Sequence, residues 1–306
     1  VRCTSTAISR PESSTLTAVF SLADLDAQEF PPVRWVVPGI LAEGSTLFCG
    51  KPKLGKSWLA MALGLAVATG GRALGQIAVE QGDVLYLALE DNQRRLKRRA
   101  KKLMQGARLP ATFHAATGWP RANEGGAENL RLWLQAHPAA RLVVIDTLAK
   151  FRPASRGGAD RYSTDYEATE TLLQIASDFR VCVLIVHHLR KAASESDVMD
   201  EISGSTGLTG GVDALLVIKR DRGQADAVLH VDGRDIEEPA ELALRFDGAT
   251  AQWVLMGDAE TMRLDEGRRG ILAALEELGA ATNQDIAERL GRDLATVQKQ
   301  TQRMLD

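Results

Sequence analysis

The sequence predicts an α/β protein with a mostly parallel sheet, antiparallel strands at one edge of that sheet, and a small all-α segment after it. Continuous apolar runs alternate with helical segments between residues 46 and 186, which is typical of parallel strands covered by helices on both faces. Short strand-like runs separated by turn residues follow between 214 and 255 and indicate antiparallel strands. From 266 to 306 only helical patterns remain.

Each element follows from a local pattern of apolar residues bounded by turn residues. We expect parallel strands at 46–49, 83–89, 141–146 and 181–186, helices at 56–69, 92–105, 129–136 and 165–179, and edge strands at 214–219, 227–231, 242–246 and 252–255. A break near 257–266 then leads to two or three short helices. The expected domains are an N-terminal tail at 1–30, an α/β domain at 31–257 and a helical segment at 264–306.

The composition is that of an ordinary globular protein, with 45% hydrophobic and 25% charged residues among 306. This length suffices for one large α/β domain and a small appendage. The net charge of −3 gives no global sign of nucleic-acid binding, so such binding must come from local patches. The apolar runs are too short for a membrane span, and three cysteines without metal-ligand spacing fit a reducing compartment, so we expect a cytoplasmic protein.

Residues 50–57 form a phosphate-binding sequence between a predicted strand and a predicted helix: Gly50, Lys51, Pro52, Lys53, Leu54, Gly55, Lys56 and Ser57. In such a loop, backbone N–H groups surround the phosphates and the positive end of the following helix assists them. We expect Lys56 to reach the β- and γ-phosphates of ATP and the Ser57 hydroxyl to bind Mg²⁺. The alternative is a glycine-rich turn with a solvated lysine.

Two acidic positions follow buried strands at the edge where parallel strands present ligands. Asp146 ends the run 142–145, where a carboxylate can hold the Mg²⁺ shell, although it could instead cap a helix. Glu90 follows the run 84–89 and is the preferred residue to orient the attacking water. Asp91 is expected to cap the helix that begins near Asn92.

His187 and His188 end the run 181–186 at the same predicted edge. A histidine at a strand end is usually structural, but two adjacent ones near the phosphates also fit a ligand contact. In that case His188 donates to the γ-phosphate and reports its presence to the next loop.

These motifs, in this order, resemble those of RecA-like ATPases, in particular the RepA-type hexameric helicases of plasmids and phages and their replicative-helicase relatives. The matching segments are 35–40, 50–57, 86–91, 142–147, 186–188, 204–213 and 233–235. The resemblance implies a RecA-like ATPase domain over 31–257, ATP and Mg²⁺ as ligands, helicase activity, a homo-hexamer and single-stranded DNA as partner. The sequence departs from the family at Lys53 and Leu54, where small residues are commoner, and at Asp232, where some relatives have lysine.

The resemblance also implies that Arg234 is an arginine finger acting on the neighbouring subunit. An arginine from a neighbour can neutralise charge on the transferred phosphoryl group. A tight hairpin predicted over 231–236 would let Arg234 protrude. Arg220 and Arg222 are rival candidates, and each of the three could equally be a solvated surface residue.

Two regions are candidates for DNA contact. The helix after Glu90 is densely basic, with Arg94, Arg95, Lys97, Arg98, Arg99, Lys101 and Lys102. Its face would attract phosphates, or it could be solvated or face another subunit. The loop 190–211 mixes basic and acidic residues and has no aromatic residue for base stacking.

The last segment predicts a helix-turn-helix of the winged type, with the wing not evident in the sequence. Thr282 caps the first helix of the pair, Gly291 ends it, and a second helix spans 295–305. Its net charge of about −2 weakens DNA binding as an interpretation. Docking of a partner protein, such as a replication protein, is an equal alternative.

The sequence thus favours an ATP-hydrolysing oligomeric DNA motor, similar to the replicative helicases of plasmids, phages or mobile elements. The alternative is an ATP-switched DNA-binding regulatory module without unwinding activity. Glu90 and Arg234 favour the motor, whereas the mixed charge of the loop 190–211 and the helix-turn-helix favour the switch.

Overall fold

The structure is a computed structural model that describes residues 20–154, 158–188, 208, 210–220 and 226–305. The chain divides into two compact units, Val1–Val33 and Arg34–Asp306. In the first unit, helix α1 (Leu22–Asp26) is held by a capping box in which Ser21 and Asp24 bind each other's backbone N–H groups. The second unit holds all the other elements described below.

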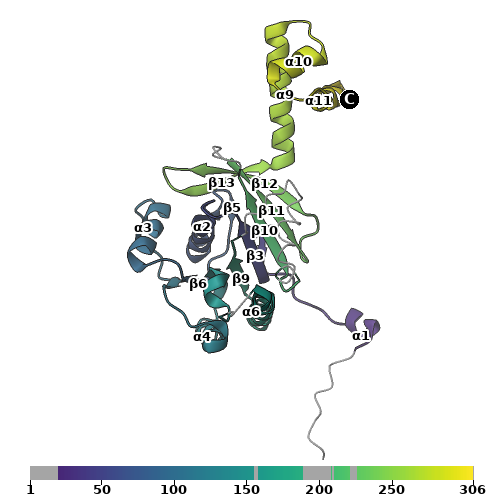
Figure 1. Ribbon diagram of the computed structural model, residues 1–306. Coiled ribbons are helices and arrows are strands. Elements are labelled where there is room, and N and C mark those ends of the chain that lie inside the picture. Colours follow the sequence, from purple (N-terminus) through teal and green to yellow (C-terminus); the bar gives the residue numbers. More distant parts are fainter. Residues whose placement is uncertain (1–19, 155–157, 189–207, 209, 221–225, 306) are drawn as a thin grey trace, which may run out of the picture. The chain divides into compact units, whose positions relative to one another are not determined.

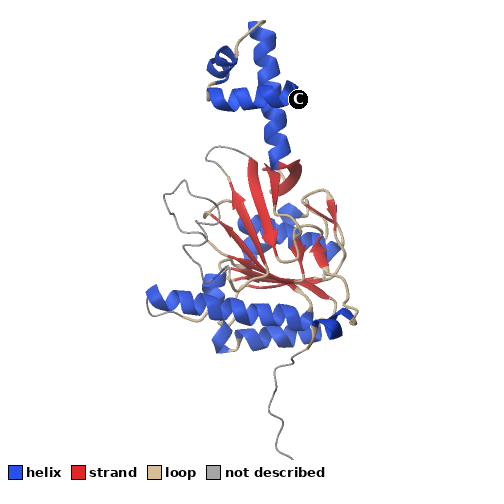
Figure 2. Cartoon of the chain, turned by 90° about the vertical axis from the view of Figure 1, so that its right-hand side faces the viewer, coloured by secondary structure: helices blue, strands red, loops and turns tan. Residues whose placement is uncertain are grey.

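A nine-stranded sheet forms the centre of the second unit (Figures 1 and 2), in the order β13-β12-β11-β10-β3-β9-β8-β6-β7. The strands are β3 (Gly44–Gly50), β6 (Asp83–Ala88), β7 (Phe113–Ala116), β8 (Ala140–Asp146), β9 (Cys182–Val186), β10 (Ala214–Lys219), β11 (Asp226–Gly233), β12 (Ala240–Asp247) and β13 (Gln252–Asp258). The strands from β10 to β7 are parallel, and β11, β12 and β13 continue as antiparallel edge strands. The predicted fold class is therefore confirmed.

Alternate residues of the parallel strands enter two separate cores, one on each face of the sheet. Phe48 and Val144 pack with helix α2 (Lys56–Thr69) and helix α3 (Gln93–Leu103). On the other face, Leu47 and Val143 pack with helix α4 (Gly126–Ala136) and helix α6 (Gly158–Phe179). The strands are buried on both sides, which explains their continuous apolar sequences.

Several short elements were not predicted because two to four residues carry no recognisable period. They are β1 (Trp35–Val37), β2 (Leu41–Ala42), β4 (Arg72–Ala73), β5 (Ile77–Ala78), the 3₁₀ helix η1 (Ala122–Glu124) and α5 (Leu148–Phe151). Strand β7 was also missed, since it lies at the edge of the sheet and is less buried than its neighbours.

The predicted break near 257–266 is wrong, because helix α9 (Ala259–Leu278) runs through it without interruption. Asp258 ends β13 and caps the helix, its carboxylate accepting from Thr261 N at 2.7 Å. Gly267 does not break the helix but makes room for a neighbour: a Cβ there would lie 2.5 Å from the amide nitrogen of Gln300.

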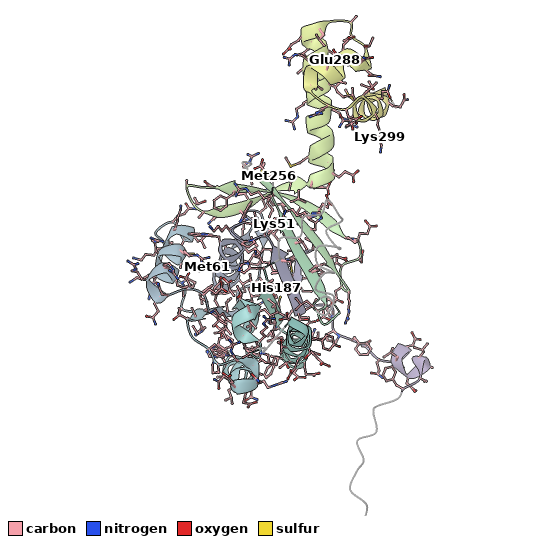
Figure 3. The ribbon with its side chains drawn as sticks, in the orientation of Figure 1. Lys51, Met61, His187, Met256, Glu288 and Lys299 are labelled. Carbon is pink, nitrogen blue, oxygen red and sulfur yellow. The ribbon has the colours of Figure 1, made fainter. Side chains whose placement is uncertain are left out.

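Helices α9, α10 (Asn283–Leu290) and α11 (Leu294–Leu305) enclose a small core of their own around Ile271, Ile286 and Val297. Thr282 and Asp285 form a capping box at the start of α10, and Gly291 ends it with φ of 62°. Glu288 and Lys299, labelled in Figure 3, are exposed on α10 and α11. None of the helices in the described ranges is long and apolar enough to cross a membrane.

Two leucines of α4 test the packing of the second core. Leu130 is fully buried, whereas Leu132 on the same helix has 52% of its surface exposed. We expect Leu130→Ala to lower the free energy of unfolding by about 2–5 kcal/mol, because it removes buried methyl groups and leaves a cavity. Leu132→Ala should change it by less than about 0.5 kcal/mol. Urea denaturation of both variants checks this, and equal losses would contradict the packing described.

Candidate active site

Four parallel strands end side by side at one edge of the sheet. The register aligns Phe48 of β3, Val186 of β9, Asp146 of β8 and Ala88 of β6 in one row. The segments that follow these strands therefore leave the sheet at the same edge. The sequence 50–57, the two histidines, Asp146 and Glu90 are brought together by this alignment, as the sequence predicts.

The loop after β3 depends on two glycines. A Cβ on Gly50 would lie 2.8 Å from Ile218 Cγ2 and 2.9 Å from the Ile218 carbonyl oxygen, because β10 passes close beside it. Gly55 has φ of 91°, a left-handed conformation that glycine adopts at low cost, and it precedes the first residue of α2. The loop thus leads directly into the N-terminus of a 14-residue helix, where backbone N–H groups are free to bind an anion.

Lys56 begins α2 and is almost fully buried, with 3% of its surface exposed. Its ammonium group donates hydrogen bonds to the carbonyl oxygens of Gly50 and Lys51, the latter at 2.9 Å. Burial lowers the pKa of Lys56 to about 8, although Cys49, Asp146 and Glu90 nearby act in the opposite direction. The side chain therefore lies back over the loop, with its charge at the place where phosphates would bind.

Asp146 is buried and accepts a hydrogen bond from the Tyr86 hydroxyl at 2.7 Å. The same hydroxyl lies 3.3 Å from the Ser57 carbonyl oxygen, so Tyr86 connects β6, β8 and the start of α2. Burial raises the pKa of Tyr86 well above its usual value, and the charge of Asp146 adds to this effect. The helix that follows is capped at Thr147 without a side-chain bond, so the Asp146 carboxylate does not act as a cap.

Ser57 and Asp146 line one recess and fit a magnesium site. Within the described ranges no three His, Cys, Asp or Glu side chains converge as metal ligands. Mg²⁺ in nucleotide sites usually takes one or two protein oxygens and completes its shell with phosphates and water. A serine hydroxyl and one carboxylate therefore meet this requirement.

Glu90 and Asp91 have different surroundings. Glu90 accepts a hydrogen bond from the Thr147 hydroxyl at 2.9 Å, and 45% of its side chain stays exposed. Asp91 pairs with Arg95 at 2.6 Å and Arg99 at 2.8 Å. Although burial alone would raise the pKa of the Asp91 carboxyl, these hydrogen bonds lower it. Glu90 is thus the carboxylate available to a ligand.

The expectation that Asp91 caps the next helix needs a correction. Asn92 is the cap, and its side chain accepts from Arg95 N at 2.9 Å. Asp91 accepts a hydrogen bond from Asn92 N, which is the N–H of the cap residue and not of the first helical turn. Asp91 instead forms ion pairs with two arginines of α3.

The two histidines differ in exposure. Burial lowers the pKa of His187 to about 4, so it is neutral at physiological pH. His188 Nε2 lies 3.8 Å from Glu90 Oε2, and burial together with the charge of Lys56 keeps its pKa below the usual value. His188 Nδ1 is buried and has no hydrogen-bond partner among the described residues. Of the two histidines, His188 is the one that lies beside Glu90.

Arg234 does not join this group, because it follows β11 at the opposite end of the sheet. Its backbone N–H donates to the Asp213 carbonyl oxygen, beside the start of β10. Its guanidinium lies 3.3 Å from Asp213 Oδ1 and stays 64% exposed. The predicted hairpin is also longer than expected, since β11 extends to Gly233 and β12 begins at Ala240.

Sequence reasoning missed an aromatic cluster beside the phosphate loop. A Cβ on Gly55 would lie 3.3 Å from Trp253 Nε1, and the Phe246 ring lies 5.0 Å from the Trp253 ring. The Arg220 guanidinium lies 6.0 Å from Phe246 and 5.8 Å from Trp253. Arg220 thus lies near two aromatic rings at the edge of the sheet where the phosphate loop begins. The other candidate, Arg222, and residues 190–207 lie outside the described residues.

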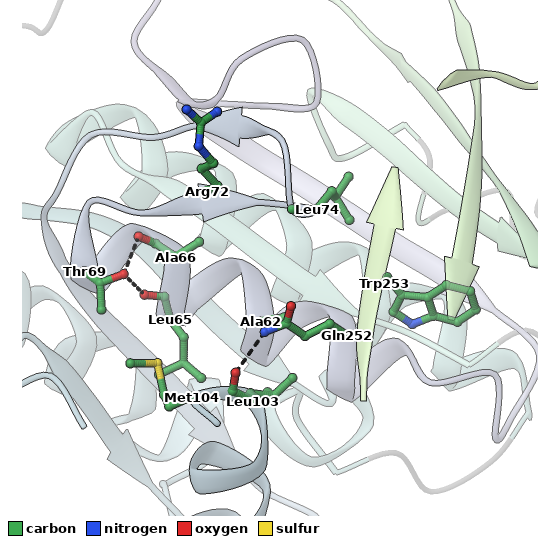
Figure 4. A pocket seen from close by; sticks show the side chains of 11 residues that line it. Ala62, Leu65, Ala66, Thr69, Arg72, Leu74, Leu103, Met104, Gln252 and Trp253 are labelled. Atoms are coloured by element: carbon green, nitrogen blue, oxygen red, sulfur yellow. Dashed lines mark hydrogen bonds between the residues drawn. The ribbon is translucent and has the colours of Figure 1, made fainter. Parts of the chain in front are cut away.

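A pocket of about 180 Å³ lies between α2, the end of α3 and β13 (Figure 4). Gln252 donates to the Leu103 carbonyl oxygen at 2.8 Å, which fastens β13 to α3. This contact holds Trp253 against Gly55. No local pattern identifies it, because residues 103 and 252 are far apart in the chain.

Comparison with known proteins identifies the family. A family model described as "AAA domain" matches residues 10–194, more than half of the chain. The chain belongs to the AAA-domain family. With the phosphate loop and the sheet order above, this AAA-domain protein is a P-loop ATPase of RecA-like fold.

Two solved structures share the fold of this AAA-domain protein at low identity. One, titled as an ATPase domain, has a TM-score of 0.54 and 13% identity, and the match covers 69% of this chain and 84% of that chain. "The Structure Of A DnaB-Like Replicative Helicase And Its Interactions With Primase" has a TM-score of 0.55 and 14% identity. That match covers 69% of this chain but 57% of the helicase, so this chain spans little more than half of it.

The two neighbouring carboxylates give a direct test in this AAA-domain protein. We expect Glu90→Gln to bind ATP but hydrolyse it at least about a hundredfold more slowly, because the amide keeps the size and loses the base. Asp91→Asn should hydrolyse ATP much faster than Glu90→Gln, since Asp91 is already paired with two arginines. Single-turnover hydrolysis with a parallel binding titration checks this. A larger loss in Asp91→Asn would identify Asp91, and not Glu90, as the base.

Proposed function

We propose that this chain is a subunit of an ATP-hydrolysing, hexameric DNA motor, similar to the RepA-type replicative helicases of plasmids, phages or mobile elements. The observation that carries the proposal is the position of Arg234. In a P-loop ATPase, an arginine near the transferred phosphoryl group raises the rate of hydrolysis. Arg234 lies away from the phosphate loop of its own chain.

The sheet register gives the distance. Gly233 pairs with Ala214, and Ala214 pairs with Thr46 of β3. Gly50, where the loop begins, is four residues further along β3, which is about 13 Å at roughly 3.3 Å per residue. The side chain of Arg234 cannot span this distance and also round the end of the strand. An exposed arginine in this position suits the site of a neighbouring subunit.

Each residue at the strand ends has a role in this mechanism. Lys56 neutralises charge on the β- and γ-phosphates, and Glu90, oriented by Thr147, accepts a proton from the attacking water. Ser57 and Asp146 hold Mg²⁺, which when bound neutralises charge on the phosphate oxygens. Tyr86 orients the Asp146 carboxylate by its hydrogen bond. His188, next to Glu90, donates to the γ-phosphate and transmits its presence to the segment after β9.

Single-stranded DNA is the proposed partner of the ring. The exposed basic residues of α3 that the structure describes are Arg94, Arg95, Lys97, Arg98, Lys101 and Lys102. Such a surface attracts phosphates without sequence preference. The solved helicase structure that shares the fold is titled for its interactions with primase. Because of this similarity, we also propose a replication protein as the partner of the C-terminal helices.

A second candidate function is an ATP-switched DNA-binding regulator without unwinding activity. It is favoured by the C-terminal helices, where α10 and α11 are joined by a short turn after Gly291, as in a helix-turn-helix. Helix α11 exposes Gln298 and Lys299, residue types that contact DNA bases and phosphates. The acidic residues on the same segment, such as Glu288, favour a protein partner instead.

ATP turnover with and without single-stranded DNA distinguishes the two functions. We expect the motor to form a hexamer with ATP and to hydrolyse it at least about tenfold faster when single-stranded DNA is added. A DNA duplex of the same length is the control. Steady-state turnover and light scattering on the same samples give both quantities. Slow turnover that DNA does not change, from a monomer or dimer, would support the regulator.

The position of Arg234 predicts complementation between subunits. Arg234→Ala should bind ATP normally but hydrolyse it about 10³–10⁵ times more slowly, the usual effect of losing a finger that acts in trans. Mixing it with Lys56→Ala should restore part of the activity, because some interfaces then pair an intact loop with an intact arginine. Mixed rings no more active than either variant, with subunit exchange demonstrated, would argue against the trans arrangement.

A further inference from the structure

A groove of about 190 Å³ lies between α3 and the edge strand β7. Most of the side chains that line it are apolar, and Leu96, Leu109 and Phe113 among them are only partly buried. Phe113 is held from behind, because its ring stacks on Tyr86 at 5.9 Å and a Cβ on Gly64 would lie 2.9 Å from Phe113 Cε2. The core therefore fixes the floor of the groove, which presents an apolar surface to the outside.

The outer edge of β7 offers main-chain groups beside this groove. Within the described part of the chain β7 is the last strand of the sheet and pairs with β6 alone. Val84 of β6 lies opposite Phe113 and donates its N–H to the Thr112 carbonyl oxygen at 2.9 Å. In a parallel ladder with this register, the N–H and C=O groups of Phe113 and Ala115 point away from β6.

Ala115 is the free position of this edge. The Phe113 N–H turns back to the Pro110 carbonyl oxygen at 3.4 Å, whereas no described residue forms a hydrogen bond with the outward groups of Ala115. Ala115 is exposed, and its side chain lines the groove. A strand edge of this kind is a template for pairing with another polypeptide.

The charge beside the groove has one sign. Lys97 lines the groove, and Lys101 follows one helical turn later on α3. Both lysines are exposed. Helix α3 contains neither Asp nor Glu, and none of the described carboxylates lines the groove. A ligand of this groove must therefore offer acidic groups next to apolar ones.

An extended polypeptide meets these conditions. A strand added to β7 would exchange main-chain hydrogen bonds with Ala115, and every second side chain would face the groove. The strand β7 itself shows this alternation, since Phe113 and Ala115 line the groove while His114 contacts Trp133 of α4 on the other face. Pairing along Phe113–Ala116 needs only four residues. DNA is less suitable, because its phosphates would meet Lys97 but not the apolar wall.

We propose that the groove between α3 and β7 binds an extended, acidic segment of a partner protein. The segment pairs with the outer edge of β7, places an apolar side chain between Leu96 and Phe113, and directs its acidic residues to Lys97 and Lys101. The groove shares no lining residue with the recess that holds Ser57 and Asp146. The proposal therefore does not depend on the ATPase mechanism.

Fluorescence anisotropy of a labelled peptide tests the groove. The probe alternates valine and threonine in its centre, carries glutamate at both ends, and is titrated with the full chain. Lys97→Glu should weaken binding at least about tenfold, because like charges then face each other. Arg94→Glu is the matched control, since it makes the same change of charge at an exposed position of α3 that does not line the groove. It should change the affinity by less than about threefold, because salt screens exposed charges at a distance.

A second variant tests the main-chain pairing. Ala115→Pro removes the outward N–H, and proline is tolerated at an edge position whose N–H does not enter the ladder. It should weaken the probe about two- to tenfold, the effect of losing one hydrogen bond. In the wild-type protein, the bound probe should slow amide hydrogen exchange at Ala115 and leave it unchanged at His114, whose N–H faces β6. Unchanged thermal unfolding shows that each variant is folded.

Several results would overturn the proposal. If the wild-type protein does not bind the probe, or binds equally well a peptide with lysine for glutamate or serine for valine, the groove does not select an acidic apolar segment. Equal weakening in Lys97→Glu and Arg94→Glu, or displacement of the probe by single-stranded DNA, would mean that the surface responds to charge alone. Loss of self-association in Lys97→Glu and Ala115→Pro, measured by light scattering, would assign the groove to a second copy of the chain.

Discussion

Parallel hydrogen bonding fixes the ends of β3, β9, β8 and β6 in one row, and the geometry of the active site depends on this register. A shift of one residue would turn every side chain of a strand to the other face of the sheet. Asp146 would then leave the Tyr86 hydroxyl, and the two cores would lose their separate sets of apolar residues. The same packing that stabilises the sheet therefore also aligns the candidate catalytic groups.

The phosphate loop and the strand-end residues could be predicted because their signals are local. The glycines and lysine of 50–57 stand together in sequence, and Asp146 and Glu90 each follow an apolar run. Helix α2 has the bounds that the apolar pattern predicts, Lys56–Thr69. The roles of these residues stay predictions, whereas the α/β fold that carries them is confirmed.

The remaining features depend on contacts between distant segments. Nothing near Tyr86 in the sequence indicates that its hydroxyl binds Asp146, sixty positions away. The location of Arg234 at the far end of the sheet follows only from the pairing of β11 with β10. The break predicted near 257–266 is wrong because no local pattern shows that Asp258, the last residue of β13, also caps α9.

Two tryptophans lie close to the phosphate loop. Trp58 follows the serine of the loop and lies under the Arg99 guanidinium, and Trp253 adjoins Gly55 with a buried indole N–H that has no partner among the described residues. Indole emission depends strongly on nearby charge and hydrogen bonding. Nucleotide binding at the loop can therefore be followed through the fluorescence of these tryptophans, without an attached dye.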